Sequence, residues 1–320
     1  MNEIDKKFKL LIKSVASLSE ESLFERIKLN FLSLPDLYKN ILKDYFERFN
    51  FWGTLNYEEG DFQEIAMKAH ALYKRKGEFV WLYNKLEDYS SKFLLYAILN
   101  NWLVYDFTSL KKSIDNRFKH YFDLDIIPNS HNEVFVDVGG YIGDSTLDFI
   151  NVYGENYKKI YCYEITEDIL PVLKDNLKKY PKIEIKNLAV KDRQGKVYLN
   201  EQGDISSNQT SKEGLKQVAC TTLDKDIKEK IDFIKMDIEG DELSALKGAK
   251  GHIINDSPKL LISVYHKNDH LWQIPKFIYK LNKNYKFYLR YYGGELYPTE
   301  VVFIAIPTQR SVKCLSLHQP

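Results

Sequence analysis

The first third of the chain carries apolar residues at helical spacing. Ile4, Phe8, Leu11, Val15 and Leu18 step by four and three residues, which places them on one face of a helix. The next stripes of this kind are Phe24, Ile27 and Phe31; Leu37, Ile41, Tyr45 and Phe49; and Phe62, Ile65, Ala69 and Leu72. Such stripes are typical of helices that pack together, so we predict a helical region here.

Two further helices are predicted from candidate N-caps, because a hydroxyl side chain can accept a hydrogen bond from a free N–H in the first helical turn. Ser90 or Ser91 would cap the first, and Thr108 or Ser109 the second. Their apolar stripes are Phe93, Ala97 and Val104, and Leu110, Ile114, Phe118 and Tyr121. We predict that residues 1–125 form an α-helical N-terminal domain and that residues 126–320 form a second domain.

The pattern changes after residue 128. Short apolar runs then alternate with helical patterns, which is the order of βαβ units around a parallel sheet. The predicted strands are 134–138, 160–163, 183–188, 196–199, 233–236 and 260–264, followed by an antiparallel hairpin of 285–291 and 301–306. The predicted helices are 145–153, 169–180, 242–249 and 272–281. This order predicts an α/β, Rossmann-like domain.

Composition and charge exclude several classes of protein. With 44% apolar and 28% charged residues, the chain is globular and not disordered. A net charge of +1 provides no general attraction to nucleic acid or to an anionic membrane. Cys162, Cys220 and Cys314 are too widely spaced for a zinc cluster. The N-terminus does not resemble a signal peptide, and no apolar run suggests a transmembrane segment. We expect a cytoplasmic protein with reduced thiols.

A glycine-rich turn follows the first predicted strand and leads into a helix. Glycines allow a tight turn and a close approach of a ligand to the backbone. A dinucleotide site would need glycines at 141 and 144, where Tyr141 and Asp144 stand. An acid at Asp137 repels a pyrophosphate but suits the sulfonium and ammonium groups of S-adenosylmethionine, so this cofactor is favoured over NAD. The predicted cofactor-binding residues of the turn are Asp137, Gly139, Gly140, Tyr141, Gly143, Asp144 and Ser145.

The second predicted strand ends at Glu164. An acid about 20 residues beyond the glycine turn is placed to accept hydrogen bonds from the ribose hydroxyls of a nucleoside cofactor. The turn alone is weak evidence, but the turn, the acid and the βαβ spacing together indicate a cofactor site. An α/β domain whose site is empty is the alternative.

Several stretches resemble the FkbM-type methyltransferases. They are Val136 to Thr146, Thr221 to Asp224, Phe233 to Gly240 followed by Leu246 to Ala249, and the ending from Tyr285 to Pro307. The resemblance begins near residue 120. It implies a class I methyltransferase fold, with a seven-stranded sheet whose last strand is antiparallel. It also implies methyl transfer to oxygen on sugars, glycans, polyketides or related natural products. For the helical region we expect only that it shapes the substrate side.

Candidate catalytic residues follow the fourth and fifth main strands, where ligands of α/β proteins bind. Asp237 and Glu239 could contact an acceptor hydroxyl or take its proton, and Asp237 is also placed to touch the cofactor. His266 could be a general base or a solvated loop histidine. Asp241 and Glu242 are interpreted as favouring a helix N-terminus.

Three further questions stay open in the sequence. Carboxylates at 237, 239, 241 and 242 could hold Mg²⁺ through oxygen ligands. Lys235 could orient an oxyanion or extend from a sheet face towards solvent. Asp204 could close over the cofactor or belong to an ordinary turn.

The leading hypothesis is an S-adenosylmethionine-dependent O-methyltransferase acting on a saccharide, a glycan or another hydroxylated small molecule. The alternative is a non-catalytic protein that keeps the cofactor fold and acts as a scaffold or partner. Tyr141 argues against an NAD-dependent oxidoreductase. No basic stripe with interleaved aromatic residues supports nucleic acid as a partner.

Overall fold

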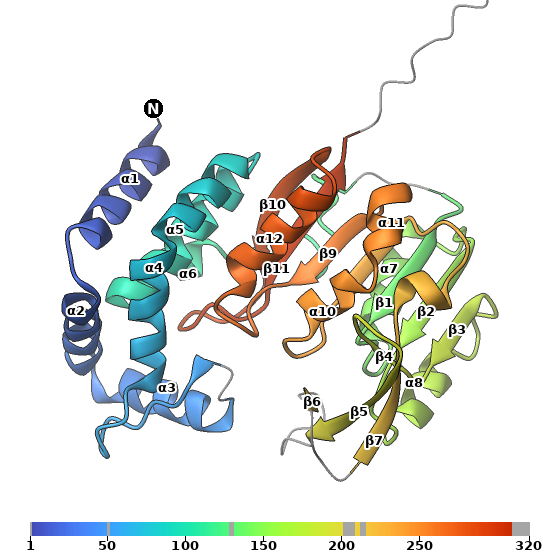
Figure 1. Ribbon diagram of the computed structural model, residues 1–320, viewed down its shortest axis with the longest axis horizontal. Helices are drawn as coiled ribbons and strands as arrows, with labels where there is room; N and C mark the ends of the chain where they lie inside the picture. Colours follow the sequence, from blue (N-terminus) through green and yellow to red (C-terminus); the bar gives the residue numbers. More distant parts are fainter. Residues whose placement is uncertain (1, 50–51, 128–130, 201–208, 212–215, 309–320) are drawn as a thin grey trace, which may run out of the picture.

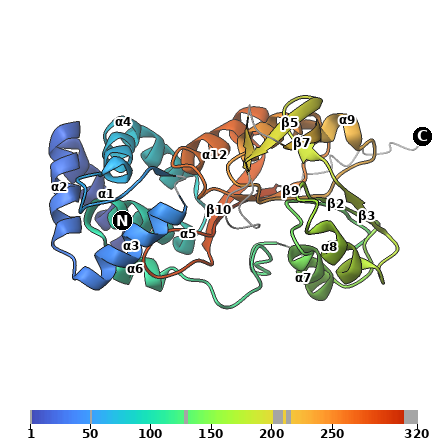
Figure 2. The ribbon, with the colours of Figure 1, turned by 90° about the horizontal axis from the view of Figure 1, so that it is seen from below.

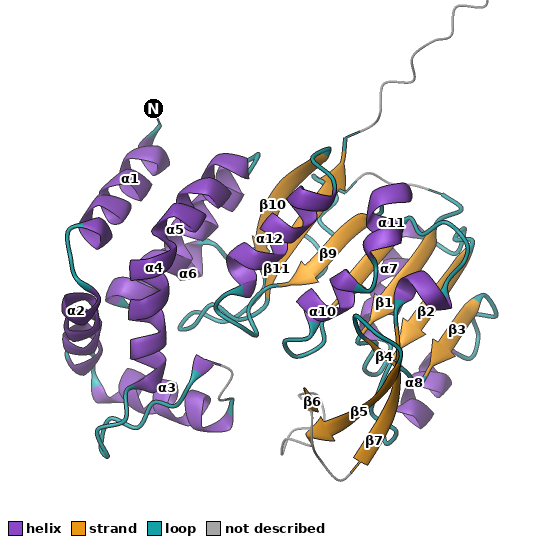
Figure 3. Ribbon diagram, viewed as in Figure 1, coloured by secondary structure: helices purple, strands orange, loops and turns teal. Residues whose placement is uncertain are grey.

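The computed structural model describes residues 2–49, 52–127, 131–200, 209–211 and 216–308. A helical region and a region built on a sheet lie side by side (Figures 1 and 3). The helical region consists of α1 (Glu3–Ala16), α2 (Glu20–Leu32), α3 (Asp36–Arg48), α4 (Gln63–Lys85), α5 (Tyr89–Val104) and α6 (Phe107–Lys112). The helical character predicted for this part of the chain is therefore present.

The apolar stripe predicted for α3 is wrong by one position. Leu42 and Phe46 are buried, whereas Leu37 and Ile41 are 66% and 41% exposed. This helix has two adjacent apolar faces, and packing against the other helices selects one of them. Tyr45 is only partly buried, and it lines the cavity described below.

The predicted caps of the last two helices are also wrong. Asp88 caps α5 by accepting a hydrogen bond from the Ser91 backbone N–H, and Asp106 caps α6 by accepting one from Ser109. Each aspartate precedes the predicted serine or threonine and satisfies the helix N-terminus first. Helix α6 ends at Lys112, because the next segment binds β10 through the Asp115 N–H and the Tyr291 carbonyl. Tyr121 therefore lies in a loop and not in a helix.

The main sheet has seven strands in the order β10-β11-β9-β8-β1-β2-β3. The strands are β1 (Val134–Val138), β2 (Lys159–Tyr163), β3 (Ile183–Lys186), β8 (Phe233–Met236), β9 (Lys259–Ser263), β10 (Tyr285–Tyr291) and β11 (Val301–Pro307). β11 is antiparallel to both of its neighbours, and the other pairings are parallel. The predicted mostly parallel sheet and its closing hairpin are confirmed.

Helices cover both faces of this sheet (Figure 2). The core residues place α7 (Asp144–Tyr153) and α8 (Leu170–Leu177) on one side, and α10 (Glu242–Lys247), α11 (Lys250–Asn255) and α12 (His270–Leu281) on the other. Alternate side chains of β1 enter different cores, with Val136 on the α10–α12 side and Phe135 on the α7–α8 side. Burial on both faces explains why the strands read as continuous apolar runs.

A second, smaller sheet follows β3. Its order is β4-β7-β5-β6, from β4 (Ala189–Val190), β5 (Gly195–Asn200), β6 (Gln209–Ser211) and β7 (Lys216–Thr221), and the short helix α9 (Leu223–Asp226) comes next. Of these strands, only β5 was expected from the sequence. Asp204 lies outside the described residues.

The helical region and the α10–α12 side of the main sheet share one apolar core. Phe79 of α4 contacts both Trp102 of α5 and Trp272 of α12, with ring centroids 6.1 and 5.4 Å apart. Ser91 of α5 accepts a hydrogen bond of 2.9 Å from the Leu289 N–H of β10. The edge of the sheet at β10 is therefore covered by helices and not by solvent.

A search of the described helices for a segment long and apolar enough to cross a membrane finds none.

Candidate active site

A cavity of about 430 Å³ opens at the carboxyl ends of β1, β2, β8 and β9. This is the edge at which parallel α/β sheets bind their ligands. Its wall is built from the glycine turn, from the segments after these strands and from parts of the helical region. The predicted site residues in the wall are Gly139, Tyr141, Asp144, Glu164, Asp237, Glu239 and His266.

The glycines of the turn are required by the packing of the protein itself. Gly139 has φ +86°, and a Cβ there would lie 1.9 Å from the Asp237 carbonyl oxygen. At Gly140 a Cβ would lie 2.2 Å from the Cys162 sulfur, and at Gly143 it would press on Leu173 and Leu177 of α8. A side chain at Gly139 would therefore disturb the junction of β1 and β8 as well as any ligand.

Asp137 lies beneath the turn, fully buried, and is not in the cavity wall. Its carboxylate accepts hydrogen bonds from the hydroxyls of Ser145 (2.6 Å) and Thr146 (2.7 Å) and lies 3.1 Å from the Lys235 ammonium. Lys235 also donates to the Gly139 carbonyl at 2.7 Å. Asp137 and Ser145 therefore stabilise the turn from inside the protein, and neither is among the residues that line the cavity. Their contact with the cofactor stays a prediction.

Lys235 is itself buried, so the predicted extension towards solvent is wrong. Burial acts to lower the pKa of this ammonium, but the charges of Asp137 and Asp237 outweigh burial and raise the pKa. The lysine therefore stays charged and links the glycine turn to the end of β8.

Glu164 is held rigidly at the end of β2. One carboxylate oxygen accepts a hydrogen bond of 2.8 Å from the Tyr141 N–H, and the other accepts one of 2.7 Å from the Thr166 N–H. Two backbone donors fix the orientation of the carboxylate, and each oxygen retains a lone pair for a ligand hydroxyl. Glu164 lines the cavity, and its contact with ribose hydroxyls stays a prediction.

Asp237, the first residue after β8, connects both ends of the cavity. It accepts a hydrogen bond of 2.6 Å from the Tyr121 hydroxyl, and its other oxygen lies 3.5 Å from His266 Nε2. Burial acts to raise its pKa, but the charges of His266 and Lys235 prevail and lower it. Asp237 is therefore ionised at neutral pH.

His266 is buried, with 1% exposure, so the interpretation as a solvated loop residue is wrong. Its Nδ1 lies 2.9 Å from Glu242, and its Nε2 lies 3.3 Å from Glu239. Burial acts to lower the pKa of the ring, but Glu239 and Glu242 outweigh burial and raise it well above its usual value. The ring is therefore a cation at neutral pH and not a free base.

Glu242 does more than favour a helix N-terminus. It is fully buried and accepts hydrogen bonds from the Ile238 and Gly240 N–H groups at 3.0 and 3.3 Å, in addition to its contact with His266. Asp241, by contrast, points to the small sheet and pairs with Lys191 at 2.6 Å. The sequence suggested the same role for Asp241 and Glu242, at a helix N-terminus, but their side chains lie in different surroundings.

The helical region supplies part of the wall. Tyr45 and Phe49, at the end of α3, line the cavity beside Tyr265. The Trp52 indole donates a hydrogen bond of 2.7 Å to the Tyr265 carbonyl, which ties this region to the segment after β9. The helical region therefore forms part of the cavity wall, and the expectation that it shapes the substrate side stays a prediction.

Sequence reasoning missed His120, Tyr121 and Glu300, which all line the cavity. Tyr121 was placed in a helical stripe, and Glu300 precedes the last strand of the hairpin, far from the glycine turn in sequence. The hairpin pattern located the turn, but no motif marked the glutamate.

The order of the strands, the single antiparallel strand and the position of the cavity define a class I methyltransferase fold. Residues 137–291 match the family model of the Methyltransferase FkbM domain. The resemblance inferred from the sequence motifs is confirmed. A comparison with curated proteins finds no match.

Among solved structures, the chain is similar to Methyltransferase FkbM from Methylobacillus flagellatus KT, with 25% identity and a TM-score of 0.63. The alignment covers 74% of this chain and 60% of that chain, so the present chain spans well under the full length of this relative.

More distant likenesses include an rRNA methylase from Streptococcus thermophilus (12% identity, 57% of this chain, 90% of that chain, TM-score 0.39). Another is Aeropyrum pernix fibrillarin with natively bound S-adenosyl-L-methionine (10% identity, 56% of this chain, 69% of that chain, TM-score 0.35). At these TM-scores, neither structure carries a functional argument.

Proposed function

We propose that the chain is an S-adenosylmethionine-dependent O-methyltransferase whose acceptor is a hydroxyl of a saccharide, a glycan or a related natural product. The observation that carries the proposal is a cavity whose wall contains the glycine turn, Glu164 and a group of aromatic and acidic side chains. The FkbM domain match over residues 137–291 supports the same class of reaction.

On the cofactor side, Glu164 would bind the ribose hydroxyls, and the turn at Gly139 and Tyr141 would lie against the nucleoside and the amino-acid end. Asp137 would act indirectly, because its charge is used to hold the turn. S-adenosylmethionine would supply the reactive methyl group on its sulfonium. The residues of the chain would bind and orient the two reactants, which can contribute roughly 7–11 kcal/mol when alignment is good.

On the acceptor side, Tyr45, Phe49 and Tyr265 offer aromatic surfaces next to Asp237 and Glu239. Aromatic rings pack on the apolar faces of sugar rings, while carboxylates accept hydrogen bonds from sugar hydroxyls. The same carboxylates oppose the approach of a polyanion, so nucleic acid is not part of the proposal. We place Asp237, Glu239 and His266 at the acceptor, with Asp237 also near the cofactor methyl.

The methyl-transfer proposal is tested by incubating the full chain with methyl-labelled S-adenosylmethionine and a panel of hydroxylated acceptors. Label in an ether linkage on a saccharide is the expected result. A chain that binds the cofactor but labels no acceptor would favour the alternative of a scaffold. Failure to bind S-adenosylmethionine in isothermal titration would contradict the cofactor assignment as well.

Glu164→Gln is expected to weaken S-adenosylmethionine binding by about 10- to 100-fold, which is the loss of one or two hydrogen bonds to a charged group. The amide NH₂ of glutamine is a donor and would replace the acceptor of one of the two backbone N–H groups that hold the carboxylate. Isothermal titration measures the change. Turnover at saturating cofactor should stay near the wild-type value, because a ribose contact is equal in the ground and transition states.

The matched control is Glu167→Gln, an exposed glutamate three residues further on. It should bind the cofactor as the wild type does. Unchanged binding by Glu164→Gln would overturn the assignment of the ribose site.

We propose that Mg²⁺ is not required. Asp237, Glu242 and His266 place potential ligand atoms within 4.8 Å of one another. However, Glu242 is occupied by His266 Nδ1 and two backbone N–H groups, and the His266 cation already balances the carboxylates. Turnover is therefore expected to be unaffected by EDTA. A loss of turnover that Mg²⁺ restores would show that a metal ion binds there instead.

A cytoplasmic location is also part of the proposal. Cys162 and Cys220 are buried free thiols, as expected in a reducing compartment.

A further inference from the structure

Glu300 is held in the cavity by a backbone conformation that glutamate rarely adopts. It directly precedes β11, its φ is +51°, and its side chain lines the cavity. Tyr121, Tyr141 and Glu239 are also non-glycine residues with positive φ, and they line the same cavity. Strained residues of this kind cost about 1–3 kcal/mol each and cluster where function requires a fixed side-chain position.

The other carboxylates on the acceptor side already have cationic partners. Asp237 lies near His266 and Lys235 and accepts from Tyr121, and Glu239 lies 3.3 Å from the His266 ring. The cations stabilise the ionised form of Asp237 and lower its pKa. Burial raises the pKa of Glu239 despite the opposing charge of His266, so Glu239 differs from Glu300 by its ion pair with the His266 ring. His266 itself already carries a proton on each ring nitrogen, so it has no lone pair to offer.

Glu300 differs from these residues in its surroundings. Among the described residues, the group that can carry positive charge within ion-pair distance of its carboxylate is His120, with Nε2 3.8 Å away. Burial lowers the pKa of His120 to about 4, so that ring is neutral at pH 7. Burial, followed by the charge of Asp237, raises the pKa of Glu300 to about 7, against the opposing effects of His266 and Tyr265.

Several groups face Glu300 from the surrounding elements. The charged ones are Asp237 and Glu239 after β8 and His266 after β9. Four tyrosine hydroxyls also interact with the charge of Glu300. The pKa values of these tyrosines are raised, so they remain neutral. They are Tyr45 of α3, Tyr121 of the loop before β1, Tyr265 after β9 and Tyr291 of β10.

We propose that Glu300 is a catalytic residue that accepts the proton of the acceptor hydroxyl during methyl transfer. The inference rests on the proposed function. The acceptor oxygen forms a bond to the methyl carbon as the carbon–sulfur bond breaks, and sulfur retains the bonding pair and loses its positive charge. The hydroxyl proton moves to a carboxylate oxygen of Glu300, which leaves a methyl ether, S-adenosylhomocysteine and a protonated glutamate. His266 remains a cation beside the reacting oxygen.

Glu300→Gln removes the proton acceptor and keeps the shape of the side chain. Turnover on the true acceptor is expected to fall by about 10²-fold or more, while the affinity for S-adenosylmethionine changes by less than about 2-fold. Turnover of the wild type should rise with pH through an apparent pKa near 7, because the carboxylate must be ionised to accept a proton, and Glu300→Gln should lose this rise.

The matched control is Glu295→Gln. Glu295 is exposed, lies on the same β10–β11 loop and pairs with Lys111 on the surface. It should retain the wild-type rate and pH profile. Glu300→Asp provides a second measurement if the glutamine variant does not fold, because a shorter carboxylate should keep the rise with pH but move its midpoint and lower the maximum rate.

Three results would overturn the inference. They are a Glu300→Gln rate near the wild type, a pH profile unchanged in both Glu300 variants, and a loss of cofactor affinity as large as the loss of turnover. Failure of the proposed function is distinguishable, because the wild-type chain would then transfer no methyl group to any acceptor before a variant is compared.

Discussion

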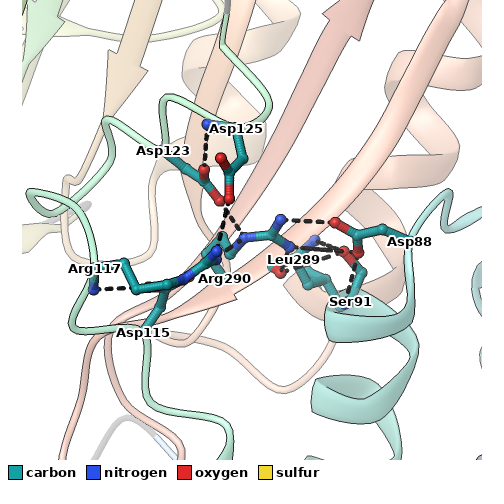
Figure 4. A network of polar contacts seen from close by, with 8 residues as sticks. All are labelled: Asp88, Ser91, Asp115, Arg117, Asp123, Asp125, Leu289 and Arg290. Carbon is teal, nitrogen blue, oxygen red and sulfur yellow. Dashed lines mark hydrogen bonds and ion pairs between the residues drawn. The ribbon is translucent and has the colours of Figure 1, made fainter.

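Replacing Arg290 with methionine is expected to lower the free energy of unfolding by about 3–5 kcal/mol, the usual cost of removing one partner from a buried ion pair. Arg290 of β10 is 4% exposed and meets Asp88 at 2.7 Å, Asp123 by a short ion pair, and Asp115 at 3.7 Å (Figure 4). Methionine fills much of the volume but leaves these acids, above all the fully buried Asp123, without a cation.

The three acids come from different parts of the chain. Asp88 caps α5, whereas Asp115 and Asp123 lie in the loop between α6 and β1 that carries His120 and Tyr121 into the cavity. Arg290 therefore joins the helical region, this loop and the sheet. We expect turnover to fall together with stability, because Tyr121 would no longer be held against Asp237.

The stabilisation of the fold by the Arg290 ion pairs is expected to decrease as the pH falls. Burial acts to raise the pKa of Asp88, but hydrogen bonds from Arg290 and Ser91 outweigh it and lower the pKa. A lowered carboxyl pKa stabilises the fold above the ordinary value of aspartate, and the effect is lost as the pH falls through the lowered value. The difference between the wild type and Arg290→Met should therefore shrink in acid.

Urea unfolding of both proteins at several pH values measures this effect. Lys286→Met is the matched control, since Lys286 is an exposed residue of the same strand. Equal unfolding free energies for the wild type and Arg290→Met at neutral pH would contradict the prediction.

His266→Gln is expected to lower turnover by about 10²–10³-fold, the usual loss when a preorganised group that stabilises developing charge is removed. It should also destabilise the fold by about 3–5 kcal/mol, because the fully buried Glu242 would lose its cation. Both losses follow from a histidine that acts as a buried positive charge.

The stabilisation by His266 depends on pH in the opposite direction to the stabilisation by Asp88. The pKa of His266 is raised in the folded state, so its stabilisation is complete below the ordinary histidine pKa and is lost as the pH rises through the raised value. Urea unfolding at pH 6 and above, and nitrogen-15 NMR of the ring, measure this. His131→Gln, at an exposed histidine, is the control. A ring that loses its proton near pH 6.5 would show that His266 is an ordinary base.

The strands of the main sheet were predictable because each is buried on both faces and bounded by turn residues. Val134–Val138 and Phe233–Met236 were predicted to the residue. Apart from β5, the small sheet was not predicted, since β7 carries polar residues such as Lys216 and Gln217. β4 is only two residues long.

The part of the cavity wall around the glycine turn was also largely predictable. Gly139 and Glu164 lie close in sequence, within one βαβ unit, and their chemistry depends on local backbone geometry that the pattern reveals. The burial of Asp137 beneath the turn was not predictable, because the sequence places this residue at the strand end but does not say to which face its side chain points.

By itself, the sequence determined the order of the strands and helices, the glycine turn and its acid, because these follow from local periodicity and from side chains that neighbour each other along the chain. Only the tertiary structure decided which side chains meet around Asp237 and His266. It brings Glu300 from the hairpin and Tyr121 from a loop to the ends of β8 and β9, and it surrounds His266 with carboxylates. The charge of a histidine and the basicity of a glutamate depend on burial and on partners distant in sequence, which no local pattern contains.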